Sequence, residues 1–82
     1  MTVSKSITRA AKSSYSQEKI PYDVPSGYKI IGVTTSIGSA EYLQPVLTSY
    51  SGGQLTYMIK NDFSAETLTR TLYANLILMR NG

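Results

Sequence analysis

The sequence predicts an all-β fold, a small antiparallel sandwich of six strands in a single domain spanning residues 1–82. No segment repeats apolar residues at the three-and-four spacing of an amphipathic helix for longer than one turn, and Thr, Tyr, Ile, Val and Leu fill the regular segments. Turn-forming residues divide these segments at short, even intervals, which is typical of small sandwiches and barrels. With 41% hydrophobic and 16% charged residues, the composition is that of a globular chain.

The first two strands are predicted over Thr2–Arg9, where apolar and polar residues alternate, and over Tyr15–Tyr22. Pro21 places the second strand at a sheet edge, because proline has no N–H to donate to a ladder. A turn follows at residues 23–27, in which Gly27 is free to adopt a positive φ.

The third strand, Tyr28–Ile37, is the clearest of the set. Gly32 in its middle predicts a bulge or a close backbone approach, since glycine weakens a regular strand. The fourth strand, Tyr42–Tyr50, contains Pro45 and is therefore predicted to be either an edge strand or bulged at that residue.

The C-terminal part begins with a glycine pair at 52–53, which predicts the tight reversal of a hairpin whose second arm is Gln54–Lys60. Residues 61–66 could form one helical turn, but we expect an irregular loop with Phe63 anchored in the core. The last strand is predicted over Thr67–Arg80.

The last strand is apolar on both faces. One face carries Leu72, Ala74, Leu76 and Leu78, and the other carries Tyr73, Asn75, Ile77 and Met79. A chain of this length hides only about 60 to 65% of its surface on folding, and it has no Cys or His to provide a disulfide or a common metal site. Self-association is the remaining way to cover the second face. We therefore expect the first face to enter the sandwich, and Tyr73, Ile77 and Met79 to form an oligomer interface.

Catalysis and cofactor binding have no support in the residue types present. Without His or Cys, the usual Ser-His and Cys-His pairs cannot be assembled. The carboxylates are scattered and suggest neither a paired-acid hydrolase nor a calcium loop: Glu18, Asp23, Glu41, Asp62 and Glu66. No phosphate-binding glycine loop is present. We expect no enzymatic activity, no cofactor and no metal.

The charge pattern gives no indication of nucleic-acid binding. The net charge of +3 comes from dispersed basic residues, no two of which are adjacent: Lys5, Arg9, Lys12, Lys19, Lys29, Lys60, Arg70 and Arg80. Nucleic-acid binders gather such charge on one element, so these are interpreted as solvated positions on several strands. No signal-peptide pattern and no apolar run of membrane-spanning length is present, so we expect no membrane insertion.

Tyrosine is over-represented, with seven copies against one Phe and no Trp. Its apolar ring and hydroxyl suit protein interfaces and carbohydrate sites, although tyrosine is also simply a good strand residue. Tyr15, Tyr42 and Tyr50 lie at or near predicted loop ends, and they are the candidates for a ligand-binding surface.

Three segments carry a resemblance to a known family. "SGYKIIGVTTS", "GGQLTYMIKN" and "LTRTLYANLILMRN" together resemble the C-terminal knob domain of bacteriophage tail-fibre, receptor-binding and head-fibre or appendage proteins from phages of Gram-positive hosts. The match is strongest over residues 26–37 and 52–82. The resemblance implies a homotrimeric sandwich on the virion, extracellular in use, that attaches to the host surface and can bind its carbohydrate. It also implies a preceding shaft or anchoring region.

The H-type lectins are similar six-stranded trimeric modules, but they typically carry a Trp near the final strand, and this chain has none. No sugar-binding residue is therefore carried over from them. The alternative to host attachment is a purely structural trimerisation or capsid-decoration module without a ligand of its own.

Overall fold

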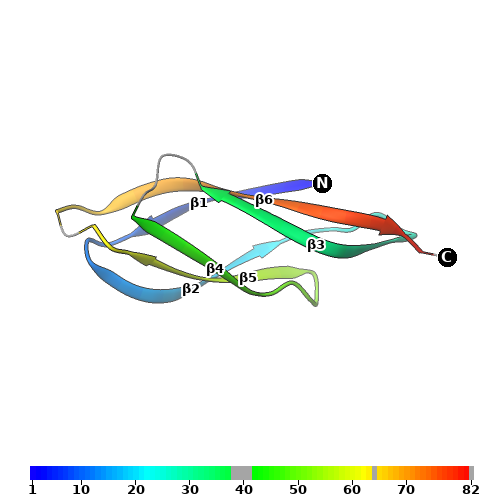
Figure 1. Cartoon of the computed structure of the whole chain (residues 1–82), viewed down its shortest axis with the longest axis horizontal. Coiled ribbons are helices and arrows are strands. Elements are labelled where there is room, and N and C mark those ends of the chain that lie inside the picture. Colours follow the sequence, from blue (N-terminus) through cyan, green and yellow to red (C-terminus); the bar gives the residue numbers. More distant parts are fainter. Residues whose placement is uncertain (38–41, 64, 82) are drawn as a thin grey trace.

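The structure is a computed structural model that describes residues 1–37, 42–63 and 65–81. Its strands are β1 (Thr2–Arg9), β2 (Ser13–Pro21), β3 (Tyr28–Ile37), β4 (Leu43–Ser49), β5 (Gln54–Asn61) and β6 (Leu68–Arg80). They form two three-stranded antiparallel sheets: sheet A has the order β1-β6-β3, and sheet B has the order β2-β5-β4. Figure 1 shows sheet A in the upper part and sheet B in the lower part of an elongated molecule. The extents along its principal axes are 51 × 20 × 15 Å. The prediction of an all-β fold with six antiparallel strands is confirmed.

Sheet A is built around β6, the longest strand with 13 residues. β3 pairs with β6 from Tyr28 opposite Arg80 onward, whereas β1 reaches only Asn75. Met1 adds two backbone hydrogen bonds to Leu76. Among the described residues, no strand lies beside the other edge of residues 77–80, so the backbone edge of β6 is open there.

Sheet B is built around β5, and both of its outer strands contain a proline, Pro21 in β2 and Pro45 in β4. Both prolines therefore lie on edge strands, as predicted. The register of β4 shifts between Leu47 and Ser49 rather than at Pro45, which lies opposite Ile59.

The core lies between the two sheets and follows the two-residue period of the strands. Its fully buried members are Ile7, Ile20, Leu55, Tyr57, Ile59, Leu72, Ala74 and Leu76. At its margin, the hydroxyl of the buried Tyr57 and that of the exposed Thr35 form a hydrogen bond of 2.7 Å between the sheets. Burial raises the pKa of the Tyr57 phenol, and the hydrogen bond to Thr35 offsets only part of this rise.

The turns use glycine where the backbone needs a positive φ. Gly52 and Gly53 have φ of 71° and 77°, the conformation required in tight hairpin turns, and Gly27 has φ of 90°. The bulge predicted at Gly32 is present, since the pairing of β3 with β6 shifts between Ile30 and Gly32.

Phe63 corrects one prediction. It lies outside the core cluster, only half-buried, and stacks on the ring of Tyr42 with 4.5 Å between ring centroids. Asn61 is buried at this end of the sandwich beside Leu43. Its side-chain nitrogen donates to the carbonyls of Arg9 and Glu66, and its side-chain oxygen accepts from the Phe63 backbone N–H. A fully hydrogen-bonded polar side chain can fill this corner without an unsatisfied group, which leaves Phe63 to cover it from outside.

Candidate functional site

The two faces of β6 differ as the sequence predicts. Leu72, Ala74 and Leu76 are buried in the core, and Leu78 is half-buried against it. On the opposite face Tyr73, Ile77 and Met79 remain 46%, 42% and 49% exposed. No other described part of the chain covers this outer face of sheet A.

Three exposed apolar side chains of sheet A lie together at one end of it. Ile77 lies across Gly32: its Cδ1 atom is 3.5 Å from the position that a Cβ on Gly32 would take. Ile31, the unpaired residue of the bulge, is 52% exposed, and Met79 is the next outward residue along β6. We call Ile31, Ile77 and Met79 the apolar end of sheet A; it lies beside the open edge of β6.

Tyr73 belongs to a different part of the same face. It stands between Ser4 of β1 and Ser36 of β3. It lines a depression together with the polar residues Thr2, Thr34, Thr35, Ser36 and Asn75. The structure therefore brings together two of the three predicted interface residues, Ile77 and Met79. The polar residue Asn75 lies between them and Tyr73 on this face of β6.

The three candidate ligand-binding tyrosines are all exposed but do not meet. Tyr42 and Tyr50 flank opposite ends of the seven-residue strand β4. Tyr42 stacks on Phe63, and the carbonyl of Tyr50 accepts a hydrogen bond from the Tyr22 hydroxyl. Tyr15 lies in β2 on the outer face of sheet B, with the Lys60 Nζ atom 5.1 Å from its ring centroid.

Tyr15 lines two neighbouring depressions. The first has a volume of about 360 Å³ and is lined by Lys12, Ser13, Ser14, Tyr15, Lys60 and Asp62. The second is mainly apolar and is lined by Tyr15, Val46, Thr48 and Met58. We call the first the Tyr15 depression. The sequence analysis missed its other residues, because they come from two strands and the segments next to them and form no motif.

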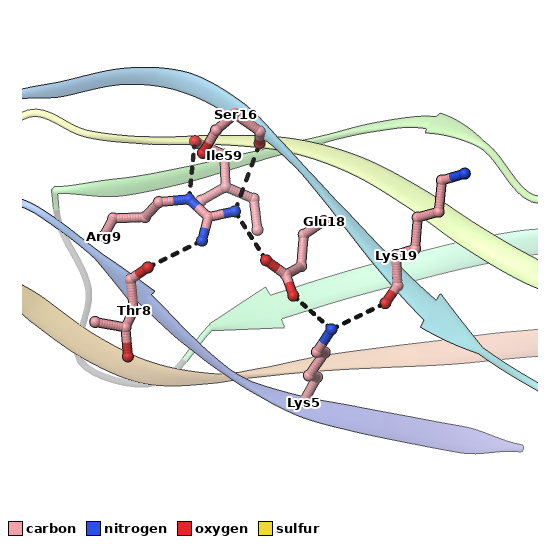
Figure 2. A network of polar contacts seen from close by, with 7 residues as sticks. All are labelled: Lys5, Thr8, Arg9, Ser16, Glu18, Lys19 and Ile59. Atoms are coloured by element: carbon pink, nitrogen blue, oxygen red, sulfur yellow. Dashed lines mark hydrogen bonds and ion pairs between the residues drawn. The ribbon is translucent and has the colours of Figure 1, made fainter.

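A network of charged side chains joins the two sheets along one side of the sandwich (Figure 2). Glu18 of β2 lies 2.5 Å from Lys5 Nζ and 3.0 Å from an Arg9 guanidinium nitrogen of β1. Arg9 also donates to the carbonyls of Thr8, Ser16 and Ile59. The prediction that all basic residues are solvated is therefore wrong for Arg9, whose side chain is only 11% exposed, and Lys5 is engaged as well.

The charge state of Glu18 follows from this arrangement. Partial burial acts to raise the pKa of its carboxyl, but the hydrogen bonds and positive charges of Lys5 and Arg9 outweigh that effect and hold the pKa below its ordinary value. Glu18 is thus a structural anion near neutral pH rather than a candidate acid.

No protein-family model, no curated protein and no solved structure matches this chain. In the described ranges, no group of three or more His, Cys, Asp and Glu residues is placed to hold a metal ion. The same part of the chain contains no helix long and apolar enough to cross a membrane. Glu41, one of the scattered acids, lies outside the described residues.

Proposed function

We propose that this chain is a non-enzymatic fibre-tip or appendage domain of a virion, which self-associates as a homotrimer and attaches to the host surface. The resemblance of its third, fifth and sixth strands to phage knob domains motivates the proposal. The observation that carries the self-association is the apolar end of sheet A. Contiguous exposed apolar side chains on a small domain are typical of interaction sites.

A second copy of the chain is the partner that fits this surface. Ile77 and Met79 carry no charge and neighbour the open edge of β6, where backbone N–H and C=O groups are free to pair with another strand. A neighbouring subunit would cover both features at once, and it would also compensate for the small core of an 82-residue chain without Cys.

The exposed tyrosines support the attachment part of the proposal. Five of the seven are 37% to 46% exposed: Tyr15, Tyr28, Tyr42, Tyr50 and Tyr73. Tyrosine presents a large ring and a hydroxyl with little conformational freedom to lose, which suits surfaces that are wet when free and buried when bound.

Two measurements test the two parts separately. Light scattering coupled to size-exclusion chromatography should give three times the chain mass at micromolar concentration, and a well-folded monomer there would contradict self-association. Fluorescently labelled protein should sediment with host cells, and binding should decrease when cell-surface carbohydrate is removed by periodate oxidation. Absence of cell binding by a folded trimer would contradict attachment.

A purely structural trimerisation or capsid-decoration module is the second candidate. It is favoured by one observation, namely that Tyr15, Tyr42 and Tyr50 do not converge on one pocket. Such a module would form the trimer and bind no cell, so the same two measurements distinguish it from an attachment domain.

A further inference from the structure

The Tyr15 depression lies at a β-bulge in β2 that the sequence pattern does not predict. The register between β2 and β5 shifts between Ser13 and Ser16, which leaves Ser14 and Tyr15 both opposite the single residue Lys60. Bulges of this kind redirect side chains and are over-represented beside functional sites. Here the bulge sets Tyr15 against Lys60 on the outer face of sheet B.

The turn before the bulge supplies a second unusual feature. Lys12 has a φ of 50°, in the left-handed region that residues other than glycine rarely adopt. Its backbone is held there by a hydrogen bond of 2.8 Å from its own N–H to the carbonyl of Phe63. This conformation costs free energy, and it brings the Lys12 side chain to the wall of the depression.

Ser13 provides a third, independent observation. Its hydroxyl is shielded from solvent and has no hydrogen-bond partner in the described part of the chain. Buried polar groups nearly always have a hydrogen-bond partner, so an unpaired buried hydroxyl indicates that a partner is missing. Ser13 lines the depression, so a rotation of its side chain would turn this hydroxyl toward the depression, where a bound polar group can satisfy it.

The charges around the depression favour an anion. Lys12 and Lys60 contribute two ammonium groups, and Asp62, whose carboxylate lies 3.5 Å from Lys60 Nζ, contributes one negative charge. Gln44 donates a hydrogen bond of 2.9 Å to the same carboxylate, which keeps it oriented. A carboxylate or phosphate group entering the depression would meet a net positive site with hydroxyl and carboxylate groups beside it.

We propose that the Tyr15 depression binds an anionic saccharide, with its carboxylate or phosphate group held by Lys12 and Lys60. The neighbouring apolar depression of Val46, Thr48 and Met58 gives the C–H face of a sugar ring a place to pack beside Tyr15. The proposal rests on the attachment function above and specifies its ligand class. Since the outer faces of the two sheets point in opposite directions, self-association through sheet A leaves this site accessible.

Amide chemical-shift titration of the full chain tests the site directly. The probes are a tetramer of galacturonic acid, glucose 6-phosphate and a neutral glucose tetramer. Shifts are expected at residues 12–15 and 58–62, with the neutral tetramer binding at least about tenfold more weakly than the better anionic probe, because charge-assisted hydrogen bonds are lost. The two anionic probes distinguish a carboxylate ligand from a phosphate ligand.

Matched variants separate the site from general surface charge. Lys60→Met should weaken binding of the anionic probe about tenfold, whereas Lys19→Met, on the same outer face but away from the depression, should change it by less than about twofold. Asp62→Asn should tighten binding by about two- to fivefold, because the competing carboxylate is removed. A gain in affinity cannot result from poor folding, and circular dichroism of each variant checks the fold.

Three outcomes would overturn the proposal. The neutral and anionic tetramers could bind equally well, Lys60→Met and Lys19→Met could lose the same affinity for the anionic probe, or the amide chemical-shift changes could fall elsewhere on the protein. Failure of this site is distinguishable from failure of the proposed function. If wild-type and Lys60→Met proteins attach to host cells equally well, the saccharide site is wrong and attachment stands. If the wild type titrates with the anionic probe but attaches to no cell, the site stands and attachment is wrong.

Discussion

A guanidinium nitrogen of Arg9 lies 3.0 Å from a carboxylate oxygen of Glu18, and this contact joins the edge strand of one sheet to the edge strand of the other. Both side chains are largely withdrawn from solvent, at 11% and 16% exposure. The core holds the middle of the sandwich together by apolar packing, whereas this side of it is held by charge.

Glu18→Gln should lower the free energy of unfolding by about 1 to 3 kcal/mol, because two charge-assisted hydrogen bonds are lost and Arg9 keeps its charge in a partly buried position. Lys5→Met should lower the free energy of unfolding by a smaller amount, since the Lys5 side chain is 43% exposed. Urea denaturation at one fixed protein concentration measures both. A loss of stability for Lys5→Met as large as that for Glu18→Gln would contradict the expectation that the more exposed lysine contributes the smaller share.

The same carboxyl predicts a pH dependence. Its pKa in the folded protein lies below the ordinary value of 4.5, so as the pH falls the unfolded chain takes up the proton first. The stabilisation from Glu18 is therefore complete above that value and is lost as the pH falls through the folded pKa. Between about pH 5 and pH 3, the wild type should lose more stability than Glu18→Gln. If the free energy of unfolding fell with pH in the same way for the two proteins, other carboxyls would control acid unfolding.

Replacing Ile77 or Met79 with Asp should dissociate the assembly and leave a folded monomer, because both side chains are exposed on the outer face of sheet A. Leu76→Asp should instead prevent folding, since a buried unpaired charge costs several kcal/mol, comparable to the whole stability of a small domain. Asn75→Asp is the control for added charge on the same face. Light scattering and circular dichroism separate the two classes of variant, and the same behaviour in both would refute the face assignment.

Two glycines should respond in opposite ways to alanine. At Gly32 a new Cβ would meet the Ile77 side chain at 3.5 Å, an ordinary contact, and φ is not positive, so Gly32→Ala should stabilise the chain by about 0.4 to 1 kcal/mol. Gly52→Ala should destabilise it by about 1 kcal/mol, because φ there is 71°. Thermal unfolding of the Met79→Asp monomer carrying each change avoids effects on assembly and keeps Ile77 beside residue 32. Destabilisation by Gly32→Ala would indicate a closer approach at this position.

Local features accounted for most of what the sequence predicted correctly. The boundaries of β1 and β3 match the predicted ones, and those of the other strands differ by two residues or fewer. Alternation along β6 also separated its buried from its exposed face, because the side-chain period of a strand is set by the backbone itself. Prolines and glycines marked edges and turns for similarly local reasons.

The features that the sequence did not predict depend on strand pairing and sheet packing. The placement of β6 between β1 and β3, the bulge that sets Tyr15 against Lys60, and the withdrawal of Arg9 toward Glu18 all depend on which strands lie side by side. Residues such as Arg9 and Glu18 are distributed like ordinary surface charges along the chain. Only packing of the two sheets brings their edges within hydrogen-bonding distance, since such contacts are non-local and no residue's own neighbours encode them.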